Sequence, residues 1–257
     1  MKKISTILKD LKKLGVSGVK QSTEDEGSSF DDILFMRKIT KRIGVNLNVK
    51  VGGCEAKNDI FFCKRAKVNG IVAPMVESKY ALKKFIQCAG RNKKNLLFMN
   101  FETNLAVRNL KSIVSSEYFK FIDGVIVGRS DLAGSMDKKK NYVNSKQIFK
   151  IAENCYKQII KVVDRKIILK MGGSITPESK IFISRLYNKN LLDFIETRNI
   201  EIKLSDKSIN NLDKIILKAF EFEIELLKIR VKTIQKHDPL LAKEYKKRIV
   251  EINKRIN

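Results

Sequence analysis

Short apolar segments alternate with amphipathic segments through the first 200 residues of the chain. The apolar segments are at most seven residues long and rich in Val, Ile and Phe, which is typical of buried strands. They cover 16–21, 46–52, 70–76, 96–102, 122–128, 166–171 and 193–198. Between them, hydrophobic residues recur at helical spacing over 30–43, 55–67, 77–90, 103–117, 145–163 and 177–190.

This alternation predicts βαβ units and a parallel sheet. Seven or eight such units in about 200 residues favour closure into an α/β barrel of the TIM type, (β/α)8, because an open doubly wound sheet usually has fewer strands. The eighth strand is the least distinct. Its best candidate is 199–204, which follows strand seven directly. We expect the barrel to occupy residues 1–206.

The two ends of the chain predict further helices. Residues 207–257 read as two helices separated at Asp238-Pro239. The first would close the barrel, and the second would cover its surface or pack on a neighbouring subunit. The first 14 residues form an amphipathic pattern without the continuous apolar stretch of a signal peptide. Because no 18-residue apolar run exists either, we expect a cytoplasmic protein without a membrane span.

Composition removes several classes of chemistry. Four cysteines form no CxxC pair, and His237 is the only histidine, so zinc sites and His-dependent triads are poorly supported. The formal charge of +25 is spread along the chain, since the last 57 residues carry a proportional share of it. A spread charge does not favour nucleic-acid binding, but it does favour anionic substrates.

Polar and flexible residues follow nearly every predicted strand. In a parallel barrel these strand ends meet at one face, where barrel enzymes have their active sites. Glu102 and Asp131 end two consecutive strands. Their carboxylate oxygens are hard ligands, which suit Mg²⁺ or Mn²⁺. The alternative for both residues is a role in helix capping. The pairs Gly52-Gly53 and Gly172-Gly173 indicate either tight turns or a cradle of backbone N–H groups for an anion.

Three ordered motifs resemble those of the HpcH/HpaI aldolase and citrate lyase β-subunit family. They are GIVAPMVES at 70–78, FMNFETNLAVRNLKSI at 98–113 and IDGVIVGRSDLAGSM at 122–136. The segments KVGGCEA at 50–56 and KMGGSITPES at 170–179 look like a divergent branch of the same family. The resemblance covers about residues 15 to 200. It implies a barrel of the phosphoenolpyruvate/pyruvate type but no particular substrate.

The resemblance also implies roles for individual residues. The family's metal-binding Glu and Asp fall on Glu102 and Asp131, and the backbone amides of Ser130 and Asp131 match those that hold the substrate carboxylate. The substrate-binding Arg of the family falls on Lys50, which keeps the charge but loses the bidentate fork. The histidine base of the aldolase branch is missing, and Glu26 or Glu24 would stand in for it.

These parts predict a metal-dependent carbon–carbon lyase or aldolase acting on a small anionic 2-oxo acid such as pyruvate, through a metal-stabilised enolate. Further candidate substrate contacts are Lys20, Gly52, Gly53, Gly128, Arg129, Ser130 and Arg198. A Schiff base on Lys20, Lys50 or Lys170 is an alternative. A second alternative is C–P, C–O or condensation chemistry on phosphoenolpyruvate. A third is a basic binding protein without catalysis. The resemblance also implies a homo-oligomer, a trimer or hexamer.

Overall fold

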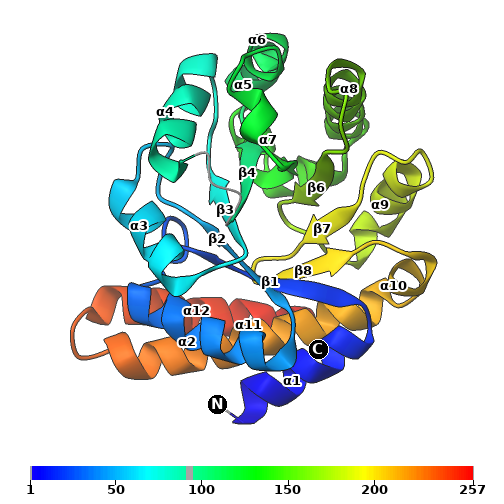
Figure 1. The fold of residues 1–257 in the computed structure, drawn as a ribbon. Coiled ribbons are helices and arrows are strands. Elements are labelled where there is room, and N and C mark those ends of the chain that lie inside the picture. Colours follow the sequence, from blue (N-terminus) through cyan, green and yellow to red (C-terminus); the bar gives the residue numbers. More distant parts are fainter. Residues whose placement is uncertain (1, 91–94, 257) are drawn as a thin grey trace.

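The structure is a computed structural model, and it describes residues 2–90 and 95–256. Within these residues eight strands form a closed barrel in chain order, which confirms the predicted α/β barrel of the TIM type (Figure 1). The strands are β1 (Val16–Ser22), β2 (Asn46–Lys50), β3 (Gly70–Ala73), β4 (Leu96–Phe101), β5 (Gly124–Gly128), β6 (Ile168–Gly172), β7 (Phe194–Glu196) and β8 (Ile200–Lys203).

The last strand differs from the others in direction. Neighbours from β1 to β7 pair in parallel, but β8 is antiparallel to both β7 and β1. Only 197–199 separate β7 from β8, whereas parallel neighbours need a crossover of roughly a dozen residues. The location expected for strand eight therefore agrees with the structure, while the strand itself is the second arm of a hairpin. The turn at 197–199 lies at the end of the barrel where the parallel strands have their carboxyl ends.

Helices cover the outside of the barrel (Figure 1). Local signals set their ends: Ser29 and Asp32 form a capping box before α2, and Gly44 ends it with a left-handed φ of 76°. The helices are α2 (Phe30–Ile43), α3 (Lys57–Ala66), α4 (Lys79–Ala89), α5 (Asn104–Arg108), α6 (Leu110–Val114), α7 (Arg129–Gly134), α8 (Lys146–Val162) and α9 (Lys180–Tyr187). Short 3₁₀ turns are η1 (Phe119–Phe121), η2 (Lys140–Asn144) and η3 (Pro177–Ser179).

Some helices depart from the periodic pattern. The helix predicted over 103–117 is divided at Asn109 into α5 and α6, and η3 precedes α9 in the segment 177–190. The Asn109 side chain donates a hydrogen bond to the Glu77 carbonyl at 2.8 Å, a tertiary contact that stabilises the break. The short helix α7 begins directly after β5, where the periodicity predicted no helix.

The terminal helices pack along one side of the barrel (Figure 1). They are α1 (Lys2–Lys13), α10 (Asp206–Asn210), α11 (Leu212–Ile234) and α12 (Pro239–Ile256). Because β8 runs antiparallel to the other strands, it carries the chain to the opposite end of the barrel, and α11 runs back along the outside toward the carboxyl ends of the parallel strands. Asp238 caps α12 by accepting a hydrogen bond from Leu241 N at 2.9 Å. From there α12 folds back on α11 of the same chain. Packing on a neighbouring subunit stays a prediction.

The core lies mainly between the sheet and the helices, with a smaller apolar cluster inside the barrel. The interior also holds charge: the Lys170 ammonium pairs with Glu201 and lies 3.8 Å from the centre of the Phe98 ring. Asn48 donates a 2.8 Å hydrogen bond to Glu201 as well. These contacts satisfy ions whose burial would otherwise be costly. In the described part of the chain, every helix is too short or too polar to cross a membrane.

Candidate functional site

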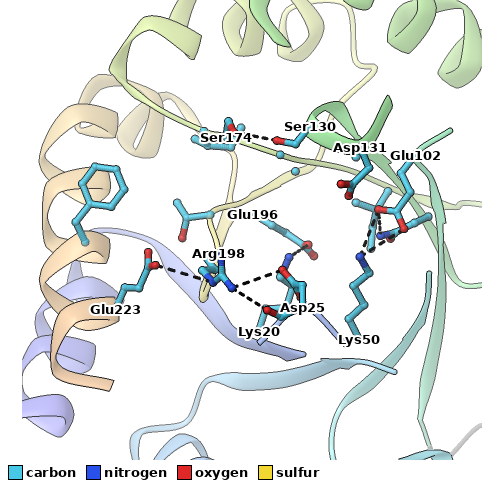
Figure 2. A pocket seen from close by; sticks show the side chains of 18 of the residues that line it. Lys20, Asp25, Lys50, Glu102, Ser130, Asp131, Ser174, Glu196, Arg198 and Glu223 are labelled. Carbon is cyan, nitrogen blue, oxygen red and sulfur yellow. Dashed lines mark hydrogen bonds and ion pairs between the residues drawn. The ribbon is translucent and has the colours of Figure 1, made fainter. Parts of the chain in front are cut away.

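A pocket of about 260 Å³ opens at the carboxyl ends of the strands (Figure 2). This volume lies below the roughly 300–1,000 Å³ of pockets for drug-sized ligands, so it suits a small metabolite. Seven predicted site residues line it: Lys20, Lys50, Glu102, Gly128, Ser130, Asp131 and Arg198. The lining does not include Glu24, Glu26, Gly52, Gly53 and Arg129.

The predicted metal ligands Glu102 and Asp131 face the same pocket. Glu102 is 1% exposed and accepts hydrogen bonds from Met75 N at 2.9 Å and Asn100 Nδ2 at 2.8 Å. Burial raises the pKa of Glu102; Lys50 opposes this increase, and the negative charge of Asp131 adds to it. The exposed Asp131 carboxylate has no hydrogen-bond or ion-pair partner among residues 2–90 and 95–256.

This donor set fits a hard divalent cation. A cation between Glu102 and Asp131 would relieve the repulsion of two carboxylates. Gly128 makes room for the pair, because a Cβ there would lie 2.7 Å from the Glu102 Cβ and 2.8 Å from its Oε2. The described residues contain no group of three or more His, Cys, Asp or Glu that could hold a metal. Water and substrate oxygens would complete the coordination, as is usual for Mg²⁺.

Lys50 joins two acidic residues at the edge of this site. Its Nζ lies 2.8 Å from Glu24 Oε2 and 3.4 Å from Glu102 Oε1. Burial alone would lower the pKa of Lys50, but Glu102 and Glu24 outweigh burial and raise it above its ordinary value. The ammonium therefore stays charged, which suits an anion contact. A Schiff base would need a lowered pKa, so this environment opposes that route at Lys50.

The start of α7 supplies the amides predicted to hold a carboxylate. Ser130 and Asp131 lie in its first turn, where backbone N–H groups have no partner within the helix. Gly173, with φ of 84°, lies against them: a Cβ at this position would be 2.4 Å from Ser130 N and 2.7 Å from Arg129 N. The hydroxyls of Ser130 and Ser174 are 2.9 Å apart and join the two loops (Figure 2). The absence of a side chain at 173 therefore lets this loop lie close to the backbone N atoms of Arg129 and Ser130.

The guanidinium of Arg129 forms hydrogen bonds with the adjacent loop and does not line the pocket. Arg129 is fully buried and donates to the Gly173 carbonyl at 2.8 Å and to Asn144 Oδ1 at 2.7 Å. It also lies 5.0 Å from the centre of the Phe182 ring, and burial lowers its pKa to about 10. The residue predicted as a substrate contact therefore holds the loop at 172–174 in place.

The acidic run after β1 is divided between three environments. Glu24 pairs with Lys50, and Glu26 is buried behind the pocket at 3% exposure. Asp25, which the sequence reasoning passed over in favour of its neighbours, is the member of the run that lines the pocket. Burial would raise the pKa of Asp25, but a hydrogen bond from Ser22 and nearby cations outweigh it and lower the pKa. Asp25 is therefore ionised at neutral pH, and its lowered pKa makes it a weaker base than an ordinary carboxylate.

Glu26 links the pocket to the terminal helices. Its carboxylate accepts hydrogen bonds from Asn199 Nδ2 at 3.0 and 3.1 Å and lies 3.6 Å from both Arg198 Nε and Arg230 Nη1. Its carbonyl accepts a 2.8 Å hydrogen bond from the Tyr245 hydroxyl of α12. Burial raises the pKa of Glu26 to about 7, although the two arginines oppose this increase.

We expect Glu26 to make stability depend on pH. Because its folded pKa of about 7 exceeds the unfolded value of 4.5, the protonated form stabilises the protein below pH 4.5, and this contribution is lost as pH rises through 7. Replacement by Gln should reduce the fall in unfolding free energy between pH 5 and pH 8 by roughly 2–3 kcal/mol. Urea denaturation at both pH values measures it. The exposed control Glu244→Gln should keep the wild-type fall, and an unchanged fall in Glu26→Gln would contradict the assignment.

The remaining predicted contacts vary in their placement. Lys20 Nζ lies 3.5 Å from Glu196 Oε2 inside the pocket. Arg198 stands in the β7–β8 turn and donates a 3.0 Å hydrogen bond to the Asp25 carbonyl. Outside the pocket lining, Gly52 N donates to Asp59 Oδ2 at 2.8 Å, and a Cβ at Gly53 would meet nothing within 4 Å.

Several lining residues were missed by sequence reasoning. Asn100 of β4 lies two positions before Glu102, which directly follows the strand, so strand periodicity could have found it. Four more come from distant helices and gave no local signal: Phe220 and Glu223 of α11, and Arg248 and Arg255 of α12.

Comparison with known protein families finds one that matches more than half of the chain. The family model for HpcH/HpaI aldolase/citrate lyase matches residues 29–163, which include the Glu102 and Asp131 motifs. No curated protein sequence matches the chain.

Solved structures share the fold at low sequence identity. The citrate synthase SbnG is 12% identical with a TM-score of 0.62, covering 84% of this chain and 89% of that one. An HpcH/HpaI aldolase from Desulfitobacterium hafniense DCB-2 is 14% identical with a TM-score of 0.56, covering 69% and 75%. An HpcH/HpaI aldolase/citrate lyase family protein from Burkholderia cenocepacia J2315 is 10% identical with a TM-score of 0.61, covering 84% and 90%. At these identities the likeness concerns the fold.

Proposed function

Because the chain belongs to the HpcH/HpaI aldolase/citrate lyase family, we propose that it is a divalent-metal-dependent lyase that breaks or makes a carbon–carbon bond next to a small 2-oxo acid. The observation that carries this proposal is the carboxylate pair Glu102 and Asp131, which faces one small pocket together with the Lys50 ammonium. A pocket of this size and charge suits a pyruvate-like anion.

The chain's own residues would bind and orient the oxo acid. The N–H groups of Ser130 and Asp131 would receive its carboxylate at the start of α7, where Gly173 keeps a side chain away from Ser130 N. The Lys50 ammonium would offset negative charge that develops on the oxo oxygen. Mg²⁺ or Mn²⁺ held by Glu102 and Asp131 would add Lewis-acid polarisation of the oxo group.

Proton transfer requires a base in contact with the second fragment. In the cleavage direction the hydroxyl of that fragment loses its proton and becomes a carbonyl, while the electron pair of the broken bond passes to the oxo acid as an enolate. Asp25 is ionised and lines the pocket, so we propose it as the acceptor of this proton. Glu24 would act through Lys50, whose ammonium it helps to hold.

Exchange of the pyruvate methyl protons with D₂O tests the proposal, because it reports enolisation without requiring the unknown second fragment. We expect exchange that depends on Mg²⁺ or Mn²⁺ and is abolished by EDTA. Asp131→Asn should reduce it about tenfold, because one negative charge at the metal is lost. Proton NMR measures the rate.

A nearby exposed carboxylate provides the matched control. Asp137 lies outside the pocket and has a left-handed φ of 56°, which Asn tolerates, so Asp137→Asn should keep the wild-type rate. Absence of metal-dependent exchange in the wild type would overturn the proposed reaction. Equal rates in the wild type and Asp131→Asn would remove Asp131 from the metal site.

A further inference from the structure

Glu196, at the carboxyl end of β7, is a buried carboxylate that has no role yet in the proposed reaction. It is 2% exposed and lines the pocket. Two ammonium groups face it: Lys20 Nζ lies 3.5 Å from its Oε2, and Lys170 Nζ lies 3.7 Å from its Oε1. Both distances exceed the roughly 2.7–3.2 Å of a protein hydrogen bond. The two cations therefore balance the charge of Glu196 without hydrogen bonding to it.

The carboxylate of Glu196 accepts no hydrogen bond from any residue of 2–90 and 95–256, and its Oε1 is completely buried. The contrast with Glu201, its direct partner across the β7–β8 hairpin, is large. Glu201 accepts hydrogen bonds from Asn48 at 2.8 Å and Ser17 at 3.2 Å, and it pairs closely with Lys170. Buried polar groups in proteins are normally hydrogen-bonded, so an exception at a pocket wall calls for a functional explanation.

The position of Glu196 relates it to the carbon atoms of the proposed substrate. The side chain lies beside the loop at 172–174, because a Cβ at Gly172 would be 3.9 Å from Glu196 Oε2. The same loop lies against the start of α7, where the substrate carboxylate is proposed to bind. Lys20 and Glu196 lie between the proposed metal pair and Arg198 (Figure 2).

An oxo acid bound in this way has one substituent left to place. Its carboxylate is at α7 and its oxo oxygen is at the proposed metal pair, so C3, the carbon next to the oxo group, is directed away from both. That direction leads to the wall of the pocket that contains Glu196 and Lys20.

We propose that Glu196 is the catalytic base that acts on C3 of the oxo acid. In the condensation direction its carboxylate removes a proton from C3, and the electron pair of that C–H bond becomes the enolate. In cleavage the carboxyl group returns a proton to C3, and the pocket water then replaces it. Glu196 thus acts on carbon, whereas Asp25 acts on the hydroxyl oxygen of the second fragment. Lys20 is a positioning residue that balances the charge of Glu196. This proposal rests on the proposed function, which supplies the oxo acid and its orientation.

Two reactions that form the same enolate test the role of Glu196 in the Mg²⁺-loaded enzyme. Exchange of pyruvate methyl protons with D₂O breaks a C–H bond and needs a base at C3. Loss of CO₂ from oxaloacetate breaks a C–C bond, whose electron pair becomes the enolate, and needs no such base. In Glu196→Gln we expect exchange to fall about a hundredfold. CO₂ release above the enzyme-free rate should stay within roughly threefold of wild type, because the metal pair is unchanged.

Glu153→Gln is the matched control. Glu153 also faces two ammonium groups, Lys157 at 3.0 Å and Lys189 at 2.6 Å, but it lies outside the pocket lining, so both rates should stay as in the wild type. Retained CO₂ release shows that Glu196→Gln folds with its metal pair in place.

The outcomes separate this proposal from the proposed function. If the wild type exchanges protons and Glu196→Gln exchanges them equally fast, Glu196 is not the base, and the proposed function stands. Equal losses of exchange and of CO₂ release in Glu196→Gln would also overturn the assignment, since they would indicate damage to the whole site. A wild type that neither exchanges protons nor releases CO₂ with Mg²⁺ would instead contradict the proposed function.

Discussion

Replacing Glu102 by Gln is expected to reduce metal-dependent pyruvate proton exchange by on the order of a hundredfold. The substitution removes the buried negative charge of the proposed metal pair and leaves Asp131 as its single carboxylate. It also leaves the Lys50 ammonium without one of its two carboxylate partners. Proton NMR of the pyruvate methyl group measures the rate, and the Mg²⁺-induced shift in melting temperature measures metal binding independently.

Without metal, the Glu102→Gln variant should also have a lower free energy of unfolding, because it loses hydrogen bonds that the carboxylate accepts. The oxygens of Glu102 accept hydrogen bonds from Met75 N, Asn100 Nδ2 and Lys50 Nζ. A Gln amide has one oxygen, so in either orientation its NH₂ group faces a donor, at a cost of roughly 1–3 kcal/mol. The exposed Glu178→Gln variant makes the same chemical change outside the pocket and should behave as wild type. A fully active Glu102→Gln enzyme would exclude the proposed metal site.

Gly173→Ala should lower the free energy of unfolding by roughly 3 kcal/mol. Residue 173 has φ of 84°, a region that L side chains rarely adopt, and its new Cβ would lie 2.4 Å from Ser130 N. That neighbour is backbone at the start of α7 and cannot rotate away. The clash would also fill the space proposed for the substrate carboxylate, so pyruvate affinity should fall in the fraction that folds. Urea denaturation gives the stability change.

Gly53→Ala is the control for this prediction. Gly53 also follows a barrel strand within a Gly-Gly pair, but an added Cβ there meets nothing within 4 Å. Its stability should stay within about 0.5 kcal/mol of wild type. If both variants lose the same stability, a general loss of glycine flexibility explains the result. If neither variant loses stability, the loop at Gly173 can move away from α7 to make room for the added Cβ.

The strands and the two carboxylates could be predicted because their signals are local. A buried strand requires consecutive apolar residues, and Glu102 and Asp131 follow such runs directly or within three positions. The hairpin of β7 and β8 also had a local signal, since three residues are too few for a parallel crossover. Asn100 could be found in the same way, because it lies two positions before Glu102 at the end of β4.

Other features could not be read from local pattern. Within the run Glu24–Asp25–Glu26, the turn geometry alone decides that Asp25 lines the pocket and Glu26 lies beneath α12. Similarly, Arg129 looked like a substrate contact beside Ser130, but its guanidinium turns to carbonyls at 173–174. Residues that are neighbours in sequence can lie in different environments, because the backbone conformation at each residue of a turn points its side chain in a different direction.

The sequence by itself therefore determined the barrel, the order of its strands and the carboxylate pair at their ends. Each depends on periodicity or on position relative to a strand, which neighbouring residues specify. Only the tertiary structure decided that Arg198, Arg248 and Arg255 border the same pocket. Their meeting depends on the reversal of β8, which sends α11 back along the barrel and brings α12 to its open end. Long-range packing of this kind has no signature in the residues that it brings together.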